Sequence, residues 1–261
     1  MCLILAAWRA HPEYSLVVAA NRDEFHARPT ASAGFWADAP HVLAGRDLEG
    51  GGTWLGITTG GRFAALTNYR DPARVVAGAP SRGELVRRFL AGDESPRHFR
   101  DWLQEVGGRY NGFNLLFGDS ESLHAYSNCG TAPGELAPGI YGLSNHLLDT
   151  PWPKVAQGKS ELALALEALP DDGPLIDLLR DDRIAPDELL PRTGVSLEWE
   201  RLLSAAFIRS PRYGTRSSTV LLVAGREVRF DEASYDPAGR ETGRCRVAFT
   251  LSLPDREAAA S

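Results

Sequence analysis

Short apolar runs separated by turn residues recur along most of the chain and predict β-strands. The runs 2–8 and 16–21 flank a His-Pro-Glu segment and predict two buried strands joined by a turn. The runs 53–58 and 62–67 flank a Gly-Gly pair, which favours a hairpin because glycine tolerates the positive φ of a tight turn. We therefore expect the chain to open with two strand pairs.

The segment between these two pairs, residues 22–44, shows no hydrophobic period. It is mostly polar and contains Pro29 and Pro40. Long segments without a period are typical of loops, and loops of this length are often functional. We expect a long loop here.

Helix signals fall into two groups along the chain. Ser95 followed by Pro96 predicts an N-cap with proline at the first helical position, and Ser81 with Glu84 has the spacing of a capping box. These signals begin the first group, and the second group follows Pro151. The predicted helices cover 85–91, 96–106, 152–169, 174–180 and 197–207.

The order of strands and helices predicts the fold class. Further strands are predicted over 111–117, 122–128, 139–144, 218–223, 227–234 and 244–251. Strands and helices come in blocks and do not alternate, which argues against a doubly wound parallel sheet. We expect an α+β protein in which antiparallel sheets carry helices on their outer faces. The chain has no internal linker or repeat, which indicates a single domain over 1–253, with 254–261 as a flexible tail.

Composition is that of an ordinary soluble globular protein. The 261 residues are 43% hydrophobic and carry a formal net charge of −6. Binding to a phosphate backbone needs clustered Lys and Arg, so we expect no nucleic-acid partner. The apolar opening at 2–8 is too short to span a bilayer and lacks a basic leader. We expect a cytoplasmic protein with no transmembrane segment, and the oligomeric state is left open.

Cysteine and histidine spacing excludes several kinds of site. Cys2, Cys129 and Cys245 lie far apart without a Cys-x-x-Cys pair, so the pattern indicates neither a disulfide scaffold nor a zinc ribbon. The six histidines show no metal-site spacing, and the glycine-rich run 50–56 precedes a strand instead of a helix. We therefore expect no metal site, no nucleotide fingerprint and no cofactor for catalysis.

Cys2 stands directly after Met1. If Met1 is removed, one residue carries both a thiol nucleophile and a free α-amine that can accept the thiol proton. An α-amine with a pKa of about 7.7–8.0 can act as a base near neutral pH without a histidine. The alternative is that Cys2 is a small buried side chain on the first strand.

Polar residues directly follow the second predicted strand, at Asn21-Arg22-Asp23-Glu24. An Asp beside an N-terminal amine would orient it, and an Arg could bind an anionic group of a substrate. The alternative is an Asx-turn at a strand end with ordinary surface charges.

Three further polar residues lie at predicted strand boundaries. Asn68 and Asn145 each follow an apolar strand, and an amide there can donate to a developing oxyanion. Asn also terminates strands for purely structural reasons. Arg216, just before a later strand, could bind a carboxylate or lie near the nucleophile, or be a solvated hairpin charge.

Nine short motifs are spread over the chain. They are Met1-Cys2, Ala19–Phe25, Arg28-Pro29, Gly51–Gly56, Ala65–Tyr69, Arg82–Leu85, Tyr110–Asn114, Tyr141–Asn145 and Tyr213–Arg216. In this order they resemble the NRDE family of Transport and Golgi organisation-like proteins, over residues 1 to about 251. That family resembles the N-terminal nucleophile (Ntn) hydrolases of the penicillin V acylase and bile-salt hydrolase branch. The resemblance implies a four-layer αββα sandwich.

The resemblance also implies catalytic roles. Cys2 would be the nucleophile, and Asp23 would hold its amine. Asn145 would donate to the oxyanion, with Asn68 flanking the pocket.

Other roles concern charge and substrate binding. Arg216 or Arg22 would supply positive charge near the thiol. The candidate substrate-binding residues are Asn21, Arg22, Trp54 and Tyr69.

Two functions follow from these assignments. The first is an N-terminal-cysteine hydrolase or acyltransferase that acts on an amide or thioester after Met1 is removed. The second is a non-catalytic carrier of haem or another hydrophobic anion in an apolar cleft lined by Trp36, Trp54 and Tyr69, because the family implies haem mobilisation and membrane trafficking. The small-molecule partner would be the substrate in the first case and haem as cargo in the second. A structural or interaction protein with an inactive pocket is a third hypothesis.

Overall fold

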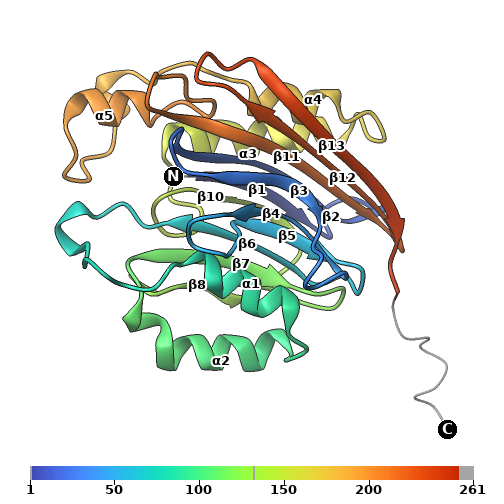
Figure 1. Cartoon of the computed structure of the whole chain (residues 1–261). Coiled ribbons are helices and arrows are strands. Elements are labelled where there is room, and N and C mark those ends of the chain that lie inside the picture. Colours follow the sequence, from blue (N-terminus) through green and yellow to red (C-terminus); the bar gives the residue numbers. More distant parts are fainter. Residues whose placement is uncertain (1, 132, 253–261) are drawn as a thin grey trace, which may run out of the picture.

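Two antiparallel sheets stack face to face in the computed structural model, which describes residues 2–131 and 133–252 (Figure 1). The predicted tail 254–261 lies outside the described residues. The first sheet has the order β10-β1-β2-β11-β12-β13. Its strands are β10 (Gly139–Leu143), β1 (Cys2–Trp8), β2 (Tyr14–Phe25), β11 (Tyr213–Ala224), β12 (Glu227–Tyr235) and β13 (Glu241–Thr250).

The second sheet runs β3-β4-β5-β6-β7-β8-β9 and is built of neighbours along the chain. Its strands are β3 (Thr30–Phe35), β4 (Val42–Asp47), β5 (Leu55–Thr58), β6 (Phe63–Asn68), β7 (Phe113–Gly118), β8 (Leu123–Ser127) and β9 (Gly134–Glu135). In contrast, the first sheet joins the two ends of the chain, because β2 pairs with β11. This pairing brings the segment after residue 213 beside the residues that follow Asn21.

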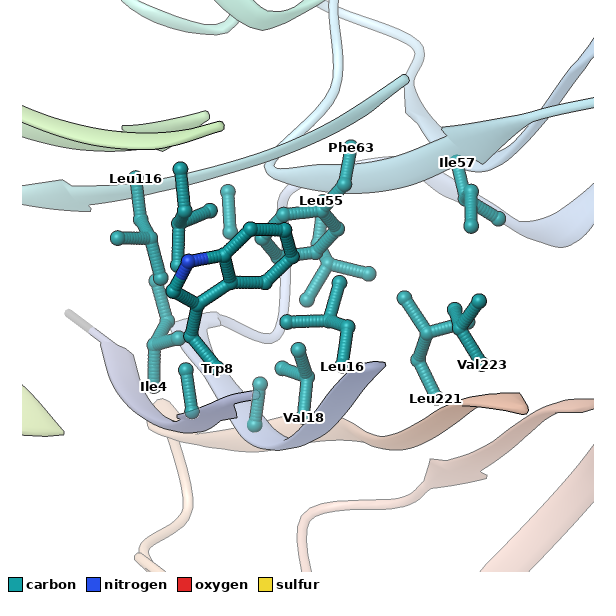
Figure 2. Packing of buried hydrophobic residues seen from close by; sticks show 14 of the residues in the cluster. Ile4, Trp8, Leu16, Val18, Leu55, Ile57, Phe63, Leu116, Leu221 and Val223 are labelled. Atoms are coloured by element: carbon teal, nitrogen blue, oxygen red, sulfur yellow. The ribbon is translucent and has the colours of Figure 1, made fainter. Parts of the chain in front are cut away.

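Strand alternation divides the residues of β1 between two cores. Ile4 and Trp8 face the second sheet, whereas Leu3 and Leu5 face a helical layer. Figure 2 shows side chains of β1, β2 and β11 pointing toward those of β5, β6 and β7 across the gap between the sheets. Both faces of β1 are buried, which explains why its sequence is continuously apolar. This agrees with the buried strand predicted over 2–8.

Helices cover the outer face of each sheet. The helices α1 (Gly83–Ala91) and α2 (Pro96–Val106) pack on the second sheet, and α3 (Pro153–Leu166) and α4 (Gly173–Leu179) pack on the first. A shorter helix, α5 (Leu197–Leu202), precedes β11. The predicted α+β class, with antiparallel sheets between helical layers, is confirmed. No helix within the described ranges is long and apolar enough to cross a membrane.

Helix starts follow the predicted signals in one case and not in the other. Ser95 caps α2, because its side chain accepts a hydrogen bond from the N–H of His98 at 3.3 Å. The start of α1 differs from the predicted capping box. There the N–H of Glu84 donates to the backbone carbonyl of Ser81, and the helix begins only at Gly83.

The predicted loop over 22–44 is wrong. β2 continues through the polar residues to Phe25, and β3 and the start of β4 occupy much of the remainder. Partner strands cause the difference: β11 hydrogen-bonds along β2, and β4 pairs with β3. Tertiary pairing thus stabilises strands whose own sequence carries no period. The predicted helix over 197–207 is also too long, since α5 ends at Leu202.

Candidate functional site

The first described residue of β1, Cys2, lies opposite Arg22 of β2 in the antiparallel register. The alternation of the strands directs these two side chains toward the gap between the sheets. The neighbouring Asn21 and Asp23 lie on the opposite face of β2, toward the helical layer. The cysteine and the aspartate therefore approach each other from two sides of the same strand end.

A cavity of about 330 Å³ opens beside Cys2 at this end of the sandwich. Its walls come from the ends of β1, β2 and β6, from the loop before β5, and from the segment that leads into α1. The charged and polar side chains that line it belong to Cys2, Arg22, Asp23, Glu24, Arg28, Asp47, Glu49, Thr53, Asn68, Ser81, Arg82 and Asn111. The site can therefore bind a polar group next to a thiol.

The surroundings of Cys2 raise the pKa of its thiol. Burial raises its pKa above the usual range, and the negative charge of Asp23 acts in the same direction. The backbone N–H of Asp23, which donates to Sγ, and the guanidinium of Arg22 oppose this increase. Because the increase dominates, the thiol needs a nearby base before it can act as a nucleophile.

Asp23 is buried among hydrogen-bond donors. Its Oδ1 accepts a hydrogen bond from Oγ1 of Thr215 at 2.7 Å, and its backbone carbonyl accepts one from the hydroxyl of Tyr213 at 3.0 Å. Burial raises the pKa of the Asp23 carboxyl, while the charge of Lys154 opposes that increase. Thr215 thus holds the Asp23 carboxyl group on β2, near the start of β1.

Arg22 is held by two contacts at the cavity. Nη1 donates to Oγ1 of Thr30 at 3.1 Å, and the guanidinium lies 4.2 Å from the ring centroid of Trp54. Both Arg22 and Trp54 line the cavity, as expected of candidate binding residues.

Two further arginines line the cavity, Arg28 and Arg82, and neither was predicted as a site residue. Nη1 of Arg82 donates to the carbonyl of Gly112 at 3.1 Å. The start of α1 lies so close to the strand loop that a Cβ on Gly52 would be 2.3 Å from the backbone of Gly83. The family motif that begins at Arg82 was the available sequence signal for that residue.

The two candidate oxyanion donors lie one behind the other. Asn68 lines the cavity, whereas Asn145 is fully buried and donates from Nδ2 to the backbone carbonyl of Asn68 at 2.9 Å. Oδ1 of Asn145 is in turn a hydrogen-bond acceptor for Arg70 at 3.3 Å. Asn68 thus flanks the cavity, and Asn145 supports it from behind, because the chain after β10 folds beneath the end of β6.

Three other predicted site residues lie away from the cavity wall. Asn21 donates to the carbonyls of Leu179 and Ala206, both at 2.8 Å, so its amide joins β2 to the helical layer. Nη1 of Arg216 donates to the carbonyls of Phe25, His26 and Arg28, and Arg216 thereby holds the bend after β2. The ring of Tyr69 packs on His146, with centroids 5.0 Å apart. These three residues thus lie outside the cavity beside Cys2, and Arg216 lines a smaller cavity of about 190 Å³ with Trp54.

The aromatic residues expected to line one apolar cleft are separated by the fold. Trp36 packs in the core beneath α1 and α2, and Trp54 packs in the core between the sheets. Tyr69 lies beyond the end of β6. Among residues 2–131 and 133–252, no group of three or more His, Cys, Asp or Glu side chains is arranged to hold a metal ion.

Fold and site together define an αββα protein with a buried cysteine and aspartate at the start of its first sheet. The sequence model of the family Transport and Golgi organisation 2 matches residues 1–237, and the chain belongs to this family. The Transport and Golgi organization protein 2 homolog of Bos taurus is 42% identical, with 93% of this chain and 97% of that protein covered. The Homo sapiens homolog is 40% identical, with 90% and 93% covered, and the Drosophila melanogaster protein is 32% identical, with 85% and 88% covered.

Solved structures also align over most of the chain. Penicillin V acylase from Agrobacterium tumefaciens aligns with a TM-score of 0.45 and 10% identity, over 96% of this chain and 86% of that one. The N-acylethanolamine-hydrolyzing acid amidase ortholog of Caenorhabditis elegans aligns with a TM-score of 0.48 and 9% identity, over 85% and 92%.

Proposed function

We propose that this protein is an N-terminal-cysteine hydrolase or acyltransferase that acts on an amide or a thioester after Met1 is removed. The observation that carries the proposal is the position of Cys2: a thiol at the start of β1, on the wall of a polar cavity and directly beside Asp23. Once Met1 is gone, the α-amine of the same residue lies next to both groups.

Each proton in the proposed reaction has a defined place. The α-amine accepts the thiol proton while Sγ attacks the substrate carbonyl carbon, and a tetrahedral intermediate forms. The intermediate collapses to a thioester on Cys2, and the α-ammonium returns the proton to the departing amine or thiol. Water or a second nucleophile then gives its proton to the α-amine and attacks the thioester carbonyl carbon. The second tetrahedral intermediate releases the acyl group as the acid or the transfer product, and the α-ammonium returns the proton to Sγ. Asp23 orients the α-amine throughout.

Asn68 is the side chain we propose as oxyanion donor. It lines the cavity with Cys2, and its backbone carbonyl is held by Asn145, which in turn is a hydrogen-bond partner of Arg70. The bond from Asn145 fixes the backbone of Asn68 beside Cys2, from which its side-chain amide can reach the cavity, and a well-placed amide donor contributes about 3–4 kcal/mol to the barrier reduction.

Mass spectrometry of the purified full-length chain tests the proposal. The intact mass should correspond to loss of Met1. Incubation with the acetyl thioester of N-acetylcysteamine should add one acetyl group, located on Cys2 by peptide mapping and lost again as the thioester hydrolyses. Cys2→Ala should abolish the adduct.

Cys129→Ala is the matched control. Cys129 is a free, half-buried cysteine outside the cavity, so its replacement should leave the acetylation unchanged. A retained Met1, or acetylation that depends equally on Cys129, would contradict the proposal.

The alternative proposal is a haem or hydrophobic-anion carrier linked to membrane trafficking. It requires a continuous apolar cleft, and the separation of Trp36 from Trp54 and Tyr69 makes it the weaker candidate. A haem titration that produced saturable binding, and lost it in a Trp54→Ala variant, would favour the carrier over the hydrolase.

A further inference from the structure

A buried lysine lies behind the candidate site. Lys154, near the start of α3, is 5% exposed, and its Nζ is fully buried with no hydrogen-bond partner among the residues that the structure describes. Buried ammonium groups are rare without a partner because the desolvation cost is high. An apolar side chain could fill this position without that desolvation cost, which suggests that the charge of Lys154 has a function.

The packing of α3 places Lys154 near the start of β1. Gly158 lies directly over Leu5, since a Cβ on Gly158 would be 2.7 Å from that side chain. Lys154 is one helical turn earlier on the same side of α3, and Leu3 is two residues earlier on the same face of β1. Both line one cavity of about 270 Å³ on the helical side of the sheet.

Asp23 lies on the same helical side of the first sheet as Leu3. Leu3 pairs with Asn21 in the register of β1 and β2, so Asp23 lies two residues further along β2 on that face. The charge of Lys154 lowers the pKa of the Asp23 carboxyl, against the effect of burial. Burial in turn lowers the pKa of Lys154 to about 8, while Asp23 and Cys2 counteract this decrease.

The other charged groups around Lys154 are already paired. Arg70, which lowers the pKa of Lys154, forms a buried ion pair with Glu200 at 2.7 Å. Glu161 and Asp181 line the cavity of the Lys154 side chain, and both contact Arg183. Asp23 is thus the carboxylate on which the Lys154 charge acts.

We propose that Lys154 is a positioning residue: its buried ammonium keeps the Asp23 carboxylate ionised, so that Asp23 can hold and orient the α-amine of Cys2. This role rests on the proposed function, because it concerns the state of the group that orients the base. Lys154 itself touches neither the substrate nor the reacting atoms.

Carbon-13 NMR of the full-length chain labelled at its Asp carboxyl carbons tests this role without any substrate. The Asp23 resonance is assigned by its loss in Asp23→Asn. In Lys154→Met, which keeps the length of the side chain and removes its charge, the Asp23 titration midpoint should rise by at least one pH unit. Lys154→Arg should leave the midpoint within a few tenths of the wild-type value.

The chain offers a matched control, because its two lysines are both on α3. Lys159 is paired with Asp149 at the surface, and Lys159→Met should leave the Asp23 titration unchanged. An Asp23 midpoint that is the same in Lys154→Met as in the wild type would overturn the proposal, as would an equal rise in Lys154→Arg.

A measurement on the unaltered protein covers the case in which Lys154→Met does not fold. The Asp23 resonance of the wild type should show a second inflection where Lys154 loses its proton, and Lys154→Arg, whose guanidinium stays protonated, should lose it. An inflection that is absent in the wild type, or that persists in Lys154→Arg and so belongs to the α-amine, would also overturn the proposal. Since neither titration uses acyl transfer, failure of this role is distinguished from failure of the proposed reaction, which the acetylation of Cys2 reports separately.

Discussion

The two faces of the strand end that carries Cys2 differ in how their polar groups are satisfied. On the helical face, the Asn21 amide bonds to two backbone carbonyls and the Arg70 guanidinium pairs with Glu200. On the face between the sheets, Cys2 and Arg22 border an open cavity. We call the bonded groups on the helical side, Asn21, Arg70 and Glu200, the closed layer; a separate cavity of about 270 Å³ lies beside Lys154 on that side, and Cys2 and Arg22 border the cavity on the other side.

Because of this difference, the bonded groups should contribute mainly to the free energy of unfolding, and the groups at the cavity mainly to binding and reaction. Polar groups in the closed layer cannot lose a partner without leaving another buried group unsatisfied, which is expensive. Groups on the cavity wall can exchange partners with a ligand at little cost. We therefore expect substitutions on the helical face to affect unfolding and those on the cavity face to affect binding and reaction.

The largest effect on stability should come from the buried ion pair. Arg70→Met leaves the Glu200 carboxylate uncompensated in the interior and should lower the free energy of unfolding by about 3–5 kcal/mol. Urea denaturation measures this change. Arg74→Met, which removes a largely exposed partner of Asp71, should change it by no more than about 1 kcal/mol. Equal losses of unfolding free energy in the two variants would show that the buried ion pair contributes no more to stability than an exposed one.

The pH dependence of unfolding should come next in size. The pKa of Lys154 is about 8 in the folded chain against 10.5 for an ordinary lysine, so between these values the unfolded chain binds more protons. Stability from this residue is therefore lowest below pH 8 and rises toward pH 10.5, by about 3 kcal/mol at about 1.36 kcal/mol per pKa unit. The difference between wild type and Lys154→Met, from urea denaturation at several pH values, isolates this contribution. A difference that does not vary with pH would mean that Lys154 is not buried in its charged form.

Loss of the Asn21 amide should have a smaller effect. Asn21→Ala leaves the carbonyls of Leu179 and Ala206 without their donor and should cost about 2 kcal/mol. The partner variant is Arg22→Ala on the opposite face of β2. It should cost less in urea denaturation, because the lost contacts are one hydrogen bond and the stacking on Trp54. The reverse order would contradict the comparison of the two faces.

Replacement of the thiol should affect stability least. Cys2→Ala removes one small atom from a cavity wall, and we expect the free energy of unfolding to change by no more than about 1 kcal/mol. Thermal or urea denaturation checks this value. A much larger loss would indicate that Cys2 serves mainly to pack the start of β1.

Part of the site could be read from local sequence. The apolar runs predicted β1 and β2, and polar residues placed directly after them located Asp23 near the chain start. Position 2 drew attention to Cys2, because a thiol there would share its residue with a free α-amine if Met1 were removed. These features depend on neighbours in the chain, which is why no tertiary information was needed.

Other parts depended on distant contacts. Asn68 and Asn145 look alike at the ends of their strands, and only the packing of the chain after β10 decides which of them faces the cavity. Arg216 resembles a site residue until its bonds to the carbonyls after β2 are known. Lys154 looks like an ordinary solvated lysine until α3 is docked over Leu3.

The sequence by itself thus determined most of the strands and helices, but not β3, β4 or β9. Only the tertiary structure decided which polar groups at this strand end are bonded to other elements and which border a cavity. The physical reason is that alternation along a strand is a local property of the backbone, whereas burial and charge depend on the elements that pack against each face.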